Sequence, residues 1–262
     1  MKSLEQIISP IAAELTQFEA FFEKTLRAET EPMDSIMRYV LDTQGKRLRP
    51  ILVLLGAKLF GEVNEQTLRA ATFVEMVHSA TLIHDDVVDE ADQRRGKSSV
   101  KAQFGNLSAV LAGDFLLAKA MLLLARPDDY AILQEMLRTT AAMSEGELMQ
   151  NCSICGDADG DNEYIDIITR KTAMLMRSCC ATGALSVNAS PKQVQQIADF
   201  GLNFGILFQL RDDILDNENI KQAQTLLPEY LQKTLEALKP FPASQTLDSL
   251  RDLTVFCAER AL

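Results

Sequence analysis

The segment from Glu65 to Ala91, "EQTLRAATFVEMVHSATLIHDDVVDEA", contains neither glycine nor proline. Apolar residues recur along it at the spacing of one face of an α-helix, and no strand-like alternation replaces that pattern. An uninterrupted pattern of this length predicts one long core helix.

The same helical spacing covers most of the remaining chain. It occurs in the ranges 36–61, 107–125, 130–150, 163–185, 190–216 and 226–238. Ser190 before Pro191 is typical of a helix N-terminus. We therefore expect an all-α fold, a single bundle of roughly ten helices in one domain that spans residues 1–262.

The composition restricts the class of protein. With 47% hydrophobic and 24% charged residues the chain can bury a full core. A net charge of -11 argues against nucleic acid as a partner. The apolar range 107–125 carries Asp114 and Lys119, which favours a buried helix over a membrane span. The N-terminus has no signal-peptide pattern, so we expect a cytoplasmic protein.

The five cysteines are expected to be reduced thiols. Cys152 and Cys155 have the CxxC spacing, but no second pair stands at zinc-ligand spacing from them.

Two clusters of three aspartates share the spacing DDxxD, each at the end of an apolar helical segment. They are Asp85, Asp86 and Asp89 in "HDDVVDEA", and Asp212, Asp213 and Asp216 in "RDDILD". Carboxylates four residues apart lie on one helix face and repel each other unless water or a hard cation separates them. One cluster alone would be a solvated acidic face. The second copy favours two clusters that face each other across the bundle and hold Mg²⁺ with a diphosphate substrate.

Basic residues stand near these acids. "GKRLRP" contains Lys46, Arg47 and Arg49 just before a predicted helix, and "QRRGK" contains Arg94 and Arg95 just after the first acid cluster. Arginine binds phosphate in a bidentate manner and lysine acts as a point charge, so two patches suit two diphosphates. Either patch alone would more often be a solvated loop.

Five segments, "GKRLRP", "HSATLIHDDVVDEADQRRGK", "GDFLLAKA", "YIDIITRKTAMLMRSCCATGA" and "FGILFQLRDDILD", occur in this order between about residue 40 and residue 216. Together they resemble the trans-polyprenyl diphosphate synthase family, of the octaprenyl or heptaprenyl kind. The resemblance implies an all-α fold of the isoprenoid synthase type and a Mg²⁺-dependent prenyltransferase. Such an enzyme joins isopentenyl diphosphate to an allylic diphosphate and makes a medium- to long-chain polyprenyl diphosphate.

The resemblance also implies the roles of individual residues. Three Mg²⁺ ions would be bound by the six aspartates, Asp85, Asp86, Asp89, Asp212, Asp213 and Asp216. Isopentenyl diphosphate would be bound by Lys46, Arg49, His78 and Arg95, with a contribution from Arg47. The allylic substrate would be contacted by Arg94, Lys171, Thr172 and Gln209, and Lys171 would also be catalytic. A homodimer without a membrane span is implied, although the product is lipophilic.

Product length is expected to depend on the side chains one turn before Asp85. These are Ala80 and Thr81, with Val77 a further turn away, and all three are small enough to leave a channel open for a growing tail. We therefore predict a medium- to long-chain product and a shortened product for Ala80→Phe.

The segment after Asp216 departs from the family pattern. The family continues with a segment rich in glycine and lysine, whereas here "NENIKQAQ" has Lys221 alone and runs into what resemble the terminal helices. We therefore expect a bundle that is shortened at its C-terminal end. Two alternatives stay open: an active enzyme, or a non-catalytic or partner-dependent subunit of a prenyl synthase. A terpene cyclase is weaker, because it needs no second diphosphate patch.

Overall fold

The computed structural model describes residues 2–43, 45–151 and 161–260. Cys152, Cys155 and the loop around them lie outside the described residues. In chain order the elements are α1 Leu4–Ile7, η1 Ser9–Ile11, α2 Ala12–Leu26, α3 Glu31–Asp42, α4 Leu48–Lys58, α5 Glu65–Val88, β1 Gln93–Arg94, β2 Lys97–Ser98, α6 Val100–Phe104, α7 Asn106–Leu124, η2 Pro127–Asp129, α8 Tyr130–Asn151, α9 Asp161–Ile168, the π-helical turn η4 Thr169–Ala173, α10 Met174–Ser186, α11 Pro191–Asp216, α12 Ile220–Ala237 and α13 Gln245–Glu259.

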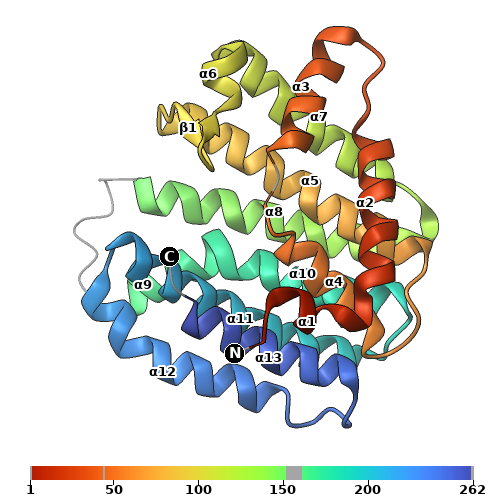
Figure 1. Ribbon diagram of the computed structural model, residues 1–262, viewed down its shortest axis with the longest axis vertical. Coiled ribbons are helices and arrows are strands. Elements are labelled where there is room, and N and C mark those ends of the chain that lie inside the picture. Colours follow the sequence, from red (N-terminus) through yellow and green to blue (C-terminus); the bar gives the residue numbers. More distant parts are fainter. Residues whose placement is uncertain (1, 44, 152–160, 261–262) are drawn as a thin grey trace.

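The fold is all-α, as predicted. Helices fill the view in Figure 1, and the two strands form only a two-residue antiparallel hairpin beside α6. The expected long helix is α5, whose N-terminus is capped by Asn64 in a reciprocal pair with Thr67. It packs against α4, α7 and α10. This packing buries most of α5, so its acidic C-terminal end is held on a rigid support.

Helices α4 and α10 approach each other closely. A Cβ built on Gly183 would lie 2.2 Å from the carbonyl oxygen of Val53, and one built on Gly56 would lie 2.9 Å from that of Cys180. Only glycine allows two backbones to come this near. The contact fixes α4, which begins directly after the "GKR" segment.

Helix α11 begins at the predicted boundary, where Ser190 caps the backbone N–H of Gln193 and Pro191 occupies the first turn. It packs between α10 and α12 and also against η4. Its last turn carries the second acid cluster. The helices α5 and α11 therefore present their acidic C-terminal ends from two sides of α10.

Helix α7 differs from the expectation of a buried helix. Ala112, Leu116 and Ala120 are buried, but Leu107 and Leu122 are each 74% exposed. Among the described helices α7 alone is long and apolar enough to cross a membrane, judged by length and composition only, and 33% of that window is buried. The apolar pattern predicted the helix correctly, but a buried helix was expected and only one face of α7 is covered.

Candidate active site

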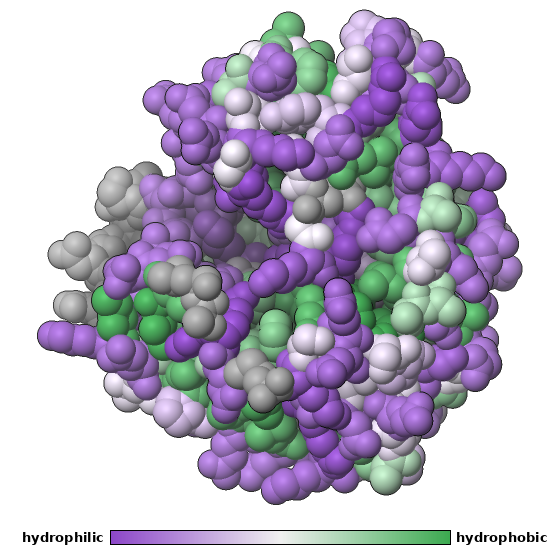
Figure 2. All heavy atoms as spheres, in the orientation of Figure 1, coloured by the Kyte–Doolittle hydropathy of each residue, from purple (hydrophilic) through white to green (hydrophobic). Residues whose placement is uncertain are grey.

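Three cavities adjoin one another where the acidic helix ends meet. The acid cavity, of about 490 Å³, lies between the end of α5 and the end of α11. The tail cavity, of about 460 Å³, lies between α5, α7 and α8. The cation cavity, of about 380 Å³, is lined by the turn before α4 and by α13. Figure 2 shows a hollow lined by hydrophilic residues. It lies between the part of the molecule that contains α3, α6 and α7 and the part that contains α9 and α12 (Figure 1).

The cavities share walls. Arg49 and His78 line both the cation cavity and the tail cavity, whereas Lys171 and Thr172 line both the tail cavity and the acid cavity. Two ligands placed in neighbouring cavities would therefore contact the same side chains. This arrangement suits two substrates that react with each other.

The acid cavity brings the two aspartate clusters together. Asp89 of the first cluster lines it together with Asp213 and Asp216 of the second. Arg94 and Lys171 line the same cavity and supply positive charge. The acid cavity therefore holds one acid of the first cluster and two of the second.

The first acid of each cluster is partly buried, and its pKa is raised. Burial first, and then the nearby charges of Glu147 and Asp89, raise the pKa of Asp85 to about 6 against the lowering effect of Lys171. Burial raises the pKa of Asp212 to about 6 as well, against the effect of Arg260. A bound cation would offset the cost of ionising both carboxylates.

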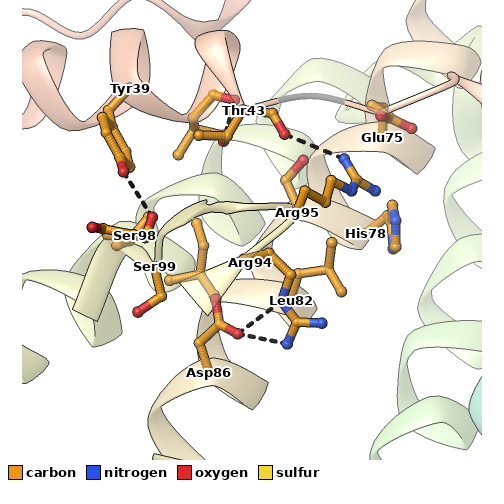
Figure 3. A pocket seen from close by; sticks show the side chains of 14 residues that line it. Tyr39, Thr43, Glu75, His78, Leu82, Asp86, Arg94, Arg95, Ser98 and Ser99 are labelled. Atoms are coloured by element: carbon orange, nitrogen blue, oxygen red, sulfur yellow. Dashed lines mark hydrogen bonds and ion pairs between the residues drawn. The ribbon is translucent and has the colours of Figure 1, made fainter. Parts of the chain in front are cut away.

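The middle acid of each cluster is buried and already paired. Asp86 is 3% exposed and accepts hydrogen bonds from Nε and Nη2 of Arg94 at 2.8 and 2.5 Å, as Figure 3 shows. Asp213 is 5% exposed and accepts hydrogen bonds from Gln209, at 2.7 Å, and from the hydroxyl of Tyr164. The clusters therefore do not present six equivalent carboxylates to the cavity.

The donor set fits Mg²⁺ in its chemistry, because carboxylate oxygens are the hard ligands that this ion prefers. Within the described ranges, no three histidine, cysteine, aspartate or glutamate side chains converge closely enough to hold a metal ion by themselves. Mg²⁺ usually keeps several waters and uses one or two carboxylates together with substrate phosphates. The site thus has the donors for an ion whose remaining ligands come from a diphosphate and water.

The cation cavity contains the predicted residues Lys46, Arg49, His78 and Arg95. Nη1 of Arg49 lies 2.8 Å from Nε2 of His78, and its buried Nε has no hydrogen-bond partner among the described residues. Burial and the nearby arginines hold the pKa of His78 well below its usual range, so His78 is neutral at pH 7 and accepts this hydrogen bond. An anion in the cavity would satisfy the free N–H of Arg49.

Arg95 extends from the hairpin toward the same region. Its backbone is left-handed, with φ at 53°, and its Nη1 donates to the carbonyl oxygen of Thr43 at 3.4 Å (Figure 3). The guanidinium also lies against Gly45 of the "GKRLRP" segment. The two basic patches predicted from sequence therefore meet in space.

Arg47 has a different environment from its neighbours. Its guanidinium pairs with Glu19 at 2.8 and 2.9 Å and with Glu75 at 3.0 Å, and it lies over the ring of Phe22. It borders the cation cavity, but its charge is already neutralised inside the protein. This geometry gives Arg47 a role in holding the turn before α4, and its contact with a diphosphate stays a prediction.

The allylic residues lie on η4 and α11. Nζ of Lys171 is 2.7 Å from Glu147, and Oγ1 of Thr172 donates to Oε1 of Gln209 at 2.8 Å. The π-helical turn puts Lys171 and Thr172 side by side on the cavity wall. Such bulges are frequent at functional sites.

The tail cavity is largely apolar, with Leu82, Leu117 and Met143 in its wall. Thr81 lines it as predicted, but Ala80 and Val77 do not: both are fully buried on another side of α5. The spacing argument identified the correct helix turn, but it could not tell which of two adjacent residues faces the cavity, since they lie about 100° apart on the helix.

Three residues of the site were not predicted. Glu147 pairs with Lys171, Tyr164 donates to Asp213, and Arg260 pairs with Asp212 while its guanidinium lies over Phe208. Glu147 and Tyr164 stand in helical segments where the sequence pattern indicates only an ordinary polar face. Arg260 is far from the acid clusters in sequence, so no local spacing connects it with Asp212.

Comparison with known proteins agrees with this geometry. Residues 30–225 match the family model described as polyprenyl synthetase. The octaprenyl diphosphate synthase of Haemophilus influenzae is 37% identical over 185 residues, which cover 71% of this chain and 56% of the relative. The heptaprenyl diphosphate synthase component 2 of Geobacillus stearothermophilus is 34% identical over 214 residues, covering 81% of this chain and 67% of the relative.

A solved structure is also similar. The polyprenyl synthase from Caulobacter crescentus, complexed with calcium and isoprenyl diphosphate, superimposes with a TM-score of 0.91 at 25% identity and covers 98% of each chain. The chain spans about half to two thirds of the length of the two curated relatives. The match to the family model and the shared fold show that the chain belongs to the polyprenyl synthetase family.

Proposed function

We propose that the chain is a Mg²⁺-dependent prenyltransferase that adds isopentenyl diphosphate to an allylic diphosphate and makes a medium- to long-chain polyprenyl diphosphate. The observation that carries this proposal is that the apolar tail cavity shares lining residues with the cation cavity on one side and with the acid cavity on the other. The relatives named above, an octaprenyl diphosphate synthase and a component of a heptaprenyl one, support the product class.

The allylic diphosphate is placed in the acid cavity with its tail in the tail cavity. Arg94 and Lys171 line the acid cavity and stabilise the charge that develops on the diphosphate as the allylic C–O bond breaks. Bound Mg²⁺ would supply further neutralisation of this leaving group. The apolar wall of the tail cavity excludes water, which would otherwise capture the carbocation.

The isopentenyl diphosphate is placed in the cation cavity, held by Lys46, Arg49 and Arg95. Its double bond then forms the new C–C bond with the allylic carbon, and the adjacent carbon loses a proton to the departed diphosphate. His78 is neutral in the wall between the two substrates and orients Arg49 without adding charge. No protein nucleophile is required.

The test is incubation of the purified protein with Mg²⁺, farnesyl diphosphate and labelled isopentenyl diphosphate. We expect labelled prenyl diphosphates longer than the primer, and none when the metal is chelated. The absence of elongation in every metal condition would overturn the proposal. Fractionation of the source cells would test the expected cytoplasmic location.

A partner-dependent subunit is the second candidate. One relative is named as a component of a synthase, and in this chain only three residues, 217–219, connect α11 to α12. This candidate predicts that elongation appears only after a second, different chain is added. Activity of the purified chain alone would exclude it.

We also propose a homodimer, with α7 at the interface. Leu107, Leu111 and Leu122 lie on α7 and are 74%, 50% and 74% exposed. Large exposed apolar side chains on one element mark a surface that another protein covers. A second copy would cover this face by packing its own α7 there.

A further inference from the structure

The hairpin that carries Arg94 and Arg95 is too small to hold its own position. Its strands, Gln93–Arg94 and Lys97–Ser98, have two residues each, and an isolated two-stranded hairpin is at best marginally stable in water. Its connection, Arg95 and Gly96, has a positive φ at both residues, 53° and 75°. Glycine adopts this backbone readily but arginine does not, so contacts outside the hairpin must fix the position of Arg95.

The last turn of α3 supplies such contacts. The hydroxyl of Tyr39 donates to the carbonyl oxygen of Ser98 at 2.7 Å, as Figure 3 shows. Nζ of Lys97 donates to the carbonyl oxygen of Asp42, also at 2.7 Å. The last carbonyl groups of a helix have no partner within the helix and form the negative end of its dipole, so they attract a lysine. Each element thus donates one hydrogen bond to the backbone of the other.

Helix α3 is a firm support for the hairpin. Its residues Ile36, Met37 and Val40 are buried in the core. The ring of Tyr39 meets the ring of Phe104 on α6 edge to face, with the centroids 5.4 Å apart. This ring contact fixes the direction of the hydroxyl, and it does not depend on the hydroxyl itself.

The hairpin places two adjacent arginines in different cavities. Arg94 lines the acid cavity, and Arg95 lines the cation cavity. Arg94 also bonds to Asp86, but a diphosphate in the acid cavity would compete for that guanidinium. Tyr39 and Lys97 lie outside both cavities, and their partners are backbone carbonyls. Their contacts therefore persist when substrates bind.

We propose that Tyr39 and Lys97 are positioning residues that hold the hairpin 93–98 against α3, so that Arg94 and Arg95 reach the two diphosphates at the same time. This inference rests on the proposed function, and it adds two residues that touch neither substrate. A movement of the hairpin would shift both arginines together. Loss of either contact should therefore weaken the binding of both substrates, whereas loss of one arginine weakens the binding of one.

The test uses four variants of the full chain. Tyr39→Phe removes the hydroxyl and keeps the ring beside Phe104. Lys97→Met removes the ammonium group, whereas Lys97→Arg keeps a donor at the same position. Tyr130→Phe is the matched control, because it removes a hydroxyl from a tyrosine on α8 that is 65% exposed.

Three measurements are made on each variant. Steady-state kinetics give KM for the allylic substrate and for isopentenyl diphosphate separately. Isothermal titration calorimetry gives the affinity for inorganic diphosphate. Hydrogen–deuterium exchange with mass spectrometry follows the backbone amides of residues 91–99, and a thermal melt accompanies each experiment.

We expect Tyr39→Phe and Lys97→Met each to raise both KM values by about two- to tenfold, the effect of one lost hydrogen bond on the population of the aligned hairpin. The affinity for inorganic diphosphate should fall by a similar factor, and the amides of residues 91–99 should exchange faster. Lys97→Arg and Tyr130→Phe should behave like the wild type in all three measurements.

Two results would refute the inference. One is a rise in KM for a single substrate, which would show that the two arginines are positioned independently. The other is a lower melting temperature with both KM values unchanged, which indicates a contribution to stability alone. Diphosphate binding and hydrogen exchange require no turnover. If the wild type makes no product but Tyr39→Phe binds diphosphate more weakly and exchanges faster at the hairpin, the proposed function alone is contradicted.

Discussion

At the scale of the residue, Thr81 is the side chain of α5 that meets the proposed path of the growing tail. It lines the tail cavity, whereas Ala80 is fully buried elsewhere on the helix. Thr81→Phe should fill part of the cavity and shorten the main product by at least one isoprene unit. The measurement is chromatography of the dephosphorylated products. Ala80→Phe is the matched control, and shortening by that variant alone would show that the tail follows another path.

The division between the two diphosphate sites can also be tested one residue at a time. Lys46 lines only the cation cavity, and Arg94 lines the acid cavity. Lys46→Ala should raise KM for isopentenyl diphosphate, and Arg94→Ala should raise KM for the allylic substrate, each by about 10- to 100-fold for the loss of a charge-assisted hydrogen bond. Equal effects of both variants on both substrates would contradict the assignment.

At the scale of the element, the contact between α4 and α10 depends on Gly183. A Cβ there would lie 2.2 Å from the carbonyl oxygen of Val53, so Gly183→Ala must move one helix. We expect a loss of about 1–3 kcal/mol in the free energy of unfolding, the usual cost of overpacking. Chemical denaturation measures this. Gly61→Ala, whose Cβ would meet the side chain of Val187 at 3.2 Å, should cost less, and an equal loss would show that the close approach is not the cause.

The connection between α2 and α3 should give stability a dependence on acid. Hydrogen bonds from Arg27, and then from the backbone of Ala28, lower the pKa of Asp34 from 3.8 to about 2. An acid with a lowered pKa in the folded state stabilises the fold above its unfolded pKa, and this contribution disappears as the pH falls from about 4 to about 2. Thermal melts of wild type and Asp34→Asn should differ at pH 7 and converge toward pH 2. A constant difference would contradict the role of the charge.

The elements were more predictable from sequence than the site. Periodicity found α5 and α11, and the Ser190 cap found the start of α11, because both signals are local. The same signals could not show that α3 ends at Asp42 and α4 begins only at Leu48, a break that lets Lys46 and Arg49 face the cavity. The pairing of Asp212 with Arg260 is a tertiary contact between residues 48 positions apart, which no local pattern encodes.

At the scale of the whole molecule, the apolar face of α7 is a surface that the bundle leaves uncovered. Leu111 and Leu122 are exposed on this helix, while Ala112 and Leu116 on its other side pack inside the bundle. A second chain that covers this face would bury the exposed leucines, at about 25 cal/mol per Å² of apolar surface. A second chain can bury these leucines without any rearrangement of the bundle.

The prediction is that sedimentation velocity gives twice the chain mass for the wild type, and that Leu111→Asp with Leu122→Asp shifts it toward a single chain. Charged residues in a buried interface without partners oppose association. Tyr130→Asp is the control, because Tyr130 is 65% exposed but begins α8 rather than lying on α7. If the control variant is a single chain, or if the double variant keeps twice the chain mass, α7 is not the interface. The helical content of the double variant should stay unchanged, because both leucines project away from the bundle that holds α7 in place.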